Sequence, residues 1–164
     1  MFEVLIYVYE NYWRGDACPE LDHLERKLST VGFEAAEIEA ALVWLNGLNL
    51  VAKGSQLPQN LADPLHTNAL AQQSENSMRV YSVAEQDQLG SECLGFISFL
   101  ESSGVLPCNM REIVMDRAMA ATGDPMSLDD LKIIILMVYW SFGEEPDALV
   151  LDELCDGSSD RLAH

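Results

Sequence analysis

The sequence predicts a mainly α-helical protein: a helical bundle with a winged-helix-like N-terminal half, which contains a short β-hairpin, and a three-helix C-terminal half. Three observations support this fold class. Apolar residues recur at helical spacing along most of the 164 residues. Helix-capping residues and glycines stand where the apolar stripes begin and end. One stretch, residues 54–77, interrupts the pattern with prolines and a run of Gln and Asn residues, so we expect a flexible loop there.

The N-terminal half begins with three expected helices. Apolar side chains repeat at i, i+3, i+4 and i+7 over residues 2–13, which is typical of a helix with one buried face. A second stripe covers residues 21–31, and Gly32 can adopt the left-handed conformation that ends a helix. A third stripe covers residues 38–48.

Two short segments after the third stripe favour strand. They are Leu50-Val51 and residues 79–81, on either side of the expected loop. Helix, turn, helix, strand, loop, strand is the order of a winged helix, with the loop as an overlong wing. The pattern therefore predicts a short β-hairpin that closes the N-terminal half.

Capping residues mark the helices of the C-terminal half. Ser82 with Glu85 forms a capping box, and the helix that it opens ends at Gly104. The following two helices open at Asn109 and at Ser127. The last of them is apolar on nearly every side, so we expect it at the centre of this half.

We divide the chain into three parts on this basis. Residues 1–82 form the winged-helix-like unit with its loop, residues 83–143 form the C-terminal helical unit, and residues 144–164 form an acidic tail with one short helix expected at 147–154.

Composition bears on partners and location. The net charge is −18, from 27 acidic and nine basic residues, and the basic residues never cluster. Nucleic-acid binding normally draws on a basic patch, so the charge disfavours it and leaves solubility, a basic protein partner or mimicry of nucleic acid. The N-terminal segment has no positive leader, the longest apolar run is far short of the ~20 residues of a membrane span, and the four cysteines form no C-x-x-C pair. We expect a cytoplasmic protein with reduced thiols and no membrane association.

No motif for catalysis, metal binding or a cofactor is present. G-x-S-x-G, H-E-x-x-H and a glycine-rich phosphate loop are all missing, and no Cys or His pair has zinc-site spacing. The adjacent acids Asp129 and Asp130 are explained by capping and by the helix dipole. We therefore expect a protein that is not an enzyme; an unrecognised active site would require a deep pocket with converging titratable groups.

Candidate contact residues come from the helical wheels. Tyr7 and Trp44 fall off the central line of their stripes; packing between helices is the simpler interpretation, but exposed aromatic rings there would form a docking surface for a partner. The alternative function is a winged-helix DNA-binding regulator, in which Asn46 and Arg79 contact DNA. Against it, the face of the third helix opposite Ile38 holds no Arg or Lys. That face consists of Ala36, Glu39, Ala40, Val43, Asn46 and Gly47.

Several of these stretches together resemble the Smg family of small bacterial proteins. The resemblance spans nearly the whole chain and departs from the family in the enlarged loop at residues 66–77 and in residues 140–143. It implies a bacterial cytosolic protein whose gene often neighbours DNA-processing and topoisomerase genes, and it supplies no catalytic residues. The expected function is a non-enzymatic interaction or regulatory adaptor linked to DNA-processing machinery. The matching stretches include Met1–Tyr7, Gly32-Phe33, Ser77–Tyr81, Phe99–Glu101, Arg111-Glu112 and Leu128–Lys132.

Overall fold

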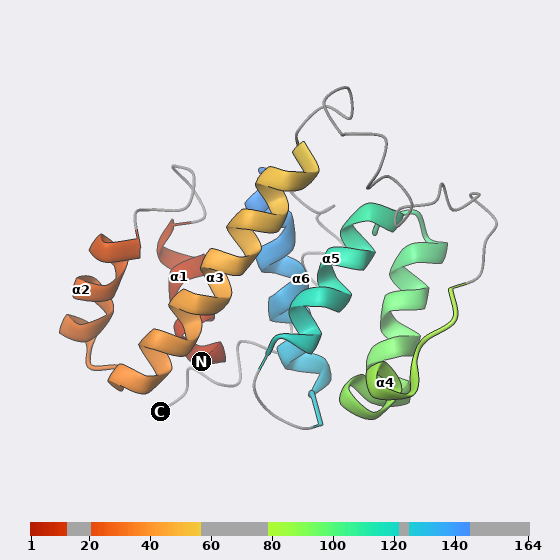
Figure 1. Cartoon of the computed structure of the whole chain (residues 1–164), viewed down its shortest axis with the longest axis horizontal. Coiled ribbons are helices and arrows are strands. Elements are labelled where there is room, and N and C mark those ends of the chain that lie inside the picture. The colour runs from red at the N-terminus through yellow and green to blue at the C-terminus, as the bar shows by residue number, and fades with distance from the viewer. Residues whose placement is uncertain (13–20, 57–78, 122–124, 145–164) are drawn as a thin grey trace, which may run out of the picture.

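The computed structural model describes residues 1–12, 21–56, 79–121 and 125–144, and within them it contains six α-helices (Figure 1). The mainly helical fold class is thereby confirmed. Residues 13–20, 57–78, 122–124 and 145–164 lie outside the described residues. They include most of the expected loop and nearly all of the expected acidic tail. The helices are α1 (Phe2–Tyr12), α2 (Leu21–Val31), α3 (Ala35–Gln56), α4 (Val83–Ser102), α5 (Cys108–Met119) and α6 (Leu128–Phe142).

Helix α6 lies at the centre of the fold. Nine consecutive residues, Leu131–Tyr139, are buried, because α1, α3, α4 and α5 all pack against this helix. A helix that is apolar on every side can only be stable when it is surrounded, and the sequence-based expectation for α6 is confirmed. Lys132 is buried with the rest, and its Nζ lies 5.7 Å from the centre of the Phe96 ring.

The remaining helices are arranged around α6. Helices α2 and α4 lie at opposite ends of the long axis, with α3 and α5 between them (Figure 1). Both predicted halves contribute to one hydrophobic core, which contains buried side chains from all six helices. The turn between α2 and α3 is made by Gly32, whose φ of 108° confirms its expected role as a helix terminator.

The winged-helix prediction is not supported, because the part of the chain that the structure describes contains no strand. Leu50 and Val51, expected in the hairpin, belong to α3, which runs on to Gln56. The buried positions Ala41, Leu45, Leu48 and Ala52 keep helical spacing through this segment. A two-residue apolar pair does not distinguish strand from helix, and packing against the core decides for helix. Residues 79–81 are irregular rather than extended in a hairpin.

Helix α3 is long and apolar enough to satisfy the length and composition criteria for a membrane span over Ala35–Gly54. Four helices nevertheless pack against it, namely α1, α2, α5 and α6. Its solvent-exposed face carries Glu39, Asn46 and Lys53. These contacts account for the apolar residues on the inner side of α3, whereas the apolar residues Val43 and Leu50 remain exposed.

Helix α4 is capped as predicted but contains a kink that the sequence did not indicate. The Ser82 side chain accepts from the Glu85 N–H, and the Glu85 carboxylate accepts from the Ser82 N–H at 2.7 Å, which completes the capping box. Gly90 interrupts the helix with φ 68° and ψ 173°. Next to the kink, the carbonyl of Gln88 accepts a 2.8 Å hydrogen bond from the Met126 N–H, which ties α4 to the start of α6.

The caps of the last two helices agree only in part with prediction. Ser127 caps α6 by accepting from the Asp130 N–H at 3.1 Å, and Gly143 ends the helix in the left-handed conformation. Helix α5 instead begins at Cys108, one residue before the predicted cap Asn109, because Pro107 occupies the N-cap position without a side-chain bond. Pro107 lacks an N–H donor and therefore suits a helix start.

Candidate docking surface on helix α3

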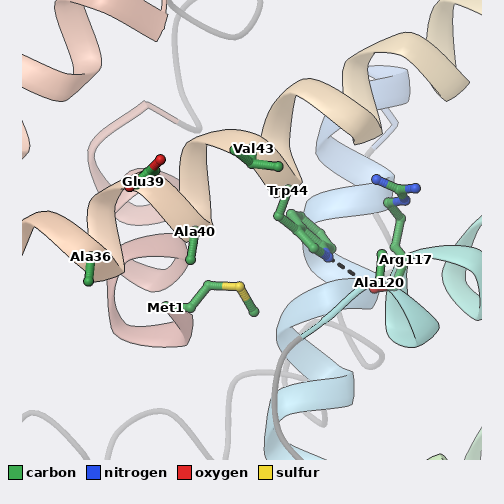
Figure 2. A pocket seen from close by; sticks show the side chains of 8 residues that line it. All are labelled: Met1, Ala36, Glu39, Ala40, Val43, Trp44, Arg117 and Ala120. Atoms are coloured by element: carbon green, nitrogen blue, oxygen red, sulfur yellow. Dashed lines mark hydrogen bonds between the residues drawn. The ribbon is translucent and has the colours of Figure 1, made fainter.

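An open groove lies along the N-terminal half of α3, where this helix meets α5 and the first residue of the chain (Figure 2). Its volume is about 360 Å³, and most of its lining is apolar. Glu39 and Arg117 supply its charged side chains. The lining residues are Met1, Ala36, Glu39, Ala40, Val43, Trp44, Arg117 and Ala120.

Trp44 forms part of the groove wall rather than an exposed anchor. Its side chain is only 3% exposed, and the indole Nε1–H donates a 2.9 Å hydrogen bond to the carbonyl of Arg117 (Figure 2). This bond joins α3 to the C-terminal end of α5. Trp44 therefore holds one wall of the groove in place. Met1, just before α1, and Ala40 of α3 line the groove beside it.

Arg117 closes the other side of the groove. A Cβ atom built on Gly47 would lie 2.0 Å from Arg117 Nη1, so the guanidinium packs directly over this glycine of α3. The neighbouring carboxylate of Asp116 accepts from Arg117 Nη2 at 2.6 Å. The positive charge of Arg117 is thus neutralised beside the groove, and Glu39 is the exposed charge at its rim.

The face of α3 that the wheel placed opposite the core is open to solvent in part. Ala36, Glu39, Val43 and Asn46 are exposed, whereas Ala40 is half-buried and Gly47 lies under Arg117. Val43 is 69% exposed and Leu50 is 65% exposed, one above the other at a spacing of seven residues. Glu39, Asn46 and Lys53 form a second exposed row beside them, again at steps of seven. We call these two rows, together with Ala36, the outer face of α3.

Tyr7, the second predicted contact residue, is not among the residues that line the groove. Its ring is half-buried and makes an edge-to-face contact with Phe33, with centroids 5.7 Å apart and an interplanar angle of 67°. The structure therefore does not bring Tyr7 into the groove that Trp44 lines. Tyr7 packs the turn between α2 and α3 onto α1.

Arg79, a candidate for DNA contact, is held in an ion-pair network. Its Nη2 lies 2.9 Å from a Glu85 oxygen, and its Nε lies 2.9 Å from Glu112 Oε1. Glu112 also pairs with Arg111 Nη2 at 2.8 Å, and Arg111, which is fully buried, pairs in turn with Glu101. The network joins the segment before α4 to both α4 and α5, so its role is structural.

Electrostatics within this network favour the charged forms. Partial burial alone would lower the pKa of Arg79. Hydrogen bonds to Glu85 and Glu112, and the negative charges of these two carboxylates, outweigh burial and raise the pKa above its usual value. Burial alone would raise the pKa of the Glu85 carboxyl. Hydrogen bonds that it accepts from the Ser82 N–H and the Arg79 guanidinium outweigh burial and lower this pKa below its usual value. Both groups are therefore fully charged at neutral pH and paired with each other.

The basic residues of the described chain do not gather into a stripe. Arg26 and Lys27 lie on α2, whereas Arg79 adjoins α4 at the other end of the long axis (Figure 1). Lys27 Nζ is 4.9 Å from the centre of the Tyr12 ring. Asn46 is exposed on the outer face of α3, where its charged row neighbours are Glu39 and Lys53. Of the two residues predicted to contact DNA, Asn46 is exposed on α3, whereas Arg79 precedes α4 and is paired with Glu85 and Glu112.

Nucleophile and metal chemistry find no support in the described residues. Burial raises the pKa of the Cys93 thiol to about 11, aided by the charges of Glu92 and Asp130, so this cysteine is protonated and unreactive at neutral pH. Cys108 is free and exposed. Within residues 1–12, 21–56, 79–121 and 125–144, no three His, Cys, Asp or Glu side chains are grouped as metal ligands.

Sequence reasoning did not identify the groove or the buried network. The groove depends on how Met1 and α5 pack beside α3, which no local pattern reveals. One feature of the sequence bears on the network. Its members Arg79, Glu101, Arg111 and Glu112 all lie within the stretches that carry the family resemblance.

Comparisons with known proteins place the chain among relatives. A family model described as "Protein of unknown function (DUF494)" matches residues 1–164. The chain is 57% identical to a protein named "Protein Smg homolog" from Leptothrix cholodnii, over 100% of both chains. It is 54% identical to the homolog from Methylibium petroleiphilum and 46% identical to that from Bordetella petrii, again over the full length of both chains. No solved structure matches.

Proposed function

Since this chain belongs to the Smg family of bacterial proteins, the family of the DUF494 model, and carries an open apolar surface on α3, we propose that it is a non-enzymatic adaptor that docks on another protein. The observation that carries the proposal is the outer face of α3 with its adjoining groove. Val43 and Leu50 leave large apolar side chains in water there. Apolar side chains grouped in this way are typical of interaction sites.

The outer face is rigidly held, which suits a docking surface. Helices α1, α2, α5 and α6 fix α3 from its other sides, and the Trp44–Arg117 bond locks the groove wall. A partner therefore meets a preformed surface and loses little free energy in ordering it.

The chemistry of the surface indicates the partner segment. An apolar side chain can enter between Met1, Ala40 and Trp44, and a Lys or Arg beside it can pair with Glu39 at the rim. The net charge of −18 adds long-range attraction for a basic protein surface. We therefore propose a partner that presents an apolar residue next to basic ones.

The family resemblance suggests the cellular setting. We propose that the adaptor acts in the cytoplasm, as the resemblance implies. The resemblance implies a gene that often neighbours DNA-processing and topoisomerase genes, so we propose a protein of that machinery as the first candidate partner.

Substitution of a single exposed residue tests the proposal. Val43→Asp introduces a carboxylate into the docking surface, while Phe99→Asp makes the same change at a 60% exposed apolar residue on α4. Both sites are exposed, so each variant should stay within about 0.5 kcal/mol of the wild type in stability. After chemical crosslinking in cells at native expression, we expect Val43→Asp to lose the adducts that wild type and Phe99→Asp retain. Equal adducts in all three proteins would contradict docking through α3.

The DNA-binding alternative has a direct test of its own. Arg79 is already paired with Glu85 and Glu112, and Glu39 stands beside Asn46 on the outer face, so we expect no retention in a filter-binding titration at ~50 mM salt. Affinity that falls steeply as salt is added would restore the alternative and count against the protein-docking proposal.

A further inference from the structure

The two rows of the outer face differ in what they offer. The first row is apolar, with Ala36, Val43 and Leu50 at steps of seven residues. The second row runs from an acid to a base, with Glu39 near the start of α3, Asn46 in the middle and Lys53 near the end. Neither Glu39 nor Lys53 makes an ion pair with another residue that the structure describes.

This order makes the face complementary to itself when two helices run in opposite directions. Glu39 and Lys53 are centred on position 46, and Val43 and Leu50 are centred between positions 46 and 47. An antiparallel copy crossing at that point would place Glu39 beside Lys53 of the second copy and Val43 beside its Leu50. Asn46 would then face Asn46 of the second copy, and an amide group can both donate to and accept from its own kind.

We propose that a second copy of this chain packs on the outer face of α3, with the two α3 helices antiparallel and crossing at Asn46. A two-fold axis repeats each contact, so one face supplies two ion pairs and two apolar pairs. Opposite charges at matched positions set the orientation of paired helices, and the exposed apolar residues supply the burial between them.

The outer face of α3 is less acidic than the chain as a whole, which favours self-association there. Two chains of charge −18 repel each other. From Glu39 onwards, however, the exposed part of α3 carries one acid, Glu39, and one base, Lys53, and so is locally neutral. Charges on other faces are screened beyond roughly 8 Å at physiological ionic strength. Because the face is one helix long, we expect a weak dimer with a dissociation constant on the order of 10–100 μM.

Self-association would also regulate the proposed adaptor, and this consequence rests on the proposed function. The dimer covers Glu39 and Val43, which also belong to the groove. A partner that docks there competes with the second copy, so binding of the partner separates the dimer. Purified chain alone tests the dimer, and its failure would leave the docking proposal to the crosslinking experiment.

Charge exchange tests the dimer most sharply. We expect sedimentation equilibrium of the full chain, from ~1 to ~200 μM at fixed salt, to show reversible dimers. Lys53→Glu and Glu39→Lys should each weaken the dimer by roughly tenfold or more, because each sets like charges opposite one another twice. The double variant E39K/K53E should return to within about threefold of wild type, since it exchanges the partners without losing a pair. Phe99→Asp is the control and should not change the association.

Two results would overturn the proposal. One is a wild-type chain that stays monomeric throughout the concentration range. The other is a double variant that associates as weakly as the two single ones, which would show that Glu39 and Lys53 do not face each other. Far-ultraviolet circular dichroism of each variant confirms that the fold is intact, because both residues are exposed.

Discussion

The kink at Gly90 yields a prediction whose size can be worked out from the backbone. Its φ of 68° and ψ of 173° lie in a region that is essentially restricted to glycine. A Cβ atom at this position would meet nothing within 4 Å, so Gly90→Ala adds backbone strain without a steric clash. The strain costs about 1–3 kcal/mol, and the lower entropy of the unfolded chain offsets about 0.4–1 kcal/mol of it. We expect a net loss of roughly 1–2 kcal/mol in the free energy of unfolding.

The backbone of α4 cannot easily relax to remove the strain that Gly90→Ala introduces. Straightening α4 would move Gln88 away from Met126, whose N–H donates to its carbonyl at 2.8 Å. Gly95→Ala is a matched control in the same helix. Gly95 is exposed, has no positive φ and has no atom within 4 Å of its built Cβ. Alanine there should stabilise the protein by about 0.5–1 kcal/mol through helix propensity.

Urea unfolding followed by circular dichroism at 222 nm measures both variants. The account predicts that the two alanine substitutions move the midpoint in opposite directions, with a difference of about 2 kcal/mol between them. A Gly90→Ala protein as stable as Gly95→Ala would refute the reasoning, because α4 would then pass through residue 90 without a glycine-only conformation.

Three further predictions concern side chains held by hydrogen bonds or ion pairs. Arg111→Met should cost about 2–4 kcal/mol in urea unfolding, because it leaves the carboxylates around a fully buried guanidinium without their partner; an unchanged midpoint would contradict the network. Glu85→Gln should be less stable than wild type at pH 7. Because the folded-state pKa of Glu85 is lowered, its contribution is present above the unfolded value near 4.5 and is lost as the pH falls through the folded pKa, so the two unfolding curves should converge in acid. Trp44→Phe removes the bond to the Arg117 carbonyl and should cost about 1–2 kcal/mol, whereas a neutral effect would place the indole N–H in water.

Local signals in the sequence predicted much of the fold. The sequence predicts Ser82 and Ser127 as caps because an acidic residue follows each serine three positions later. In the structure the N–H of that acidic residue donates to the serine hydroxyl. The central position of α6 followed from its apolar residues on every side. The exposure of Glu39, Val43 and Asn46 followed from the helical wheel, since rotation per residue fixes which side faces the core. The exposure of Leu50 did not, because this residue was predicted in a strand.

Sequence-based prediction was wrong or silent where contacts between distant parts of the chain decide the structure. Leu50-Val51 suggested a strand, but the core beneath Leu48 and Ala52 extends the helix. The burial of Trp44 depends on the carbonyl of Arg117, which is 73 residues away in the chain. Such contacts have no periodicity along the sequence, so the groove and the ion-pair network could be seen only in three dimensions.

We propose that this protein meets other proteins, whether a partner or a second copy, through the outer face of α3. Site-specific photo-crosslinking in cells tests it most directly, with a photoreactive amino acid placed at Val43 or Leu50 and, for comparison, at the exposed Val83 or Phe99 of α4. We expect adducts from positions 43 and 50 and little above background from positions 83 and 99. Equal yields from all four positions, or adducts from α4 alone, would contradict it.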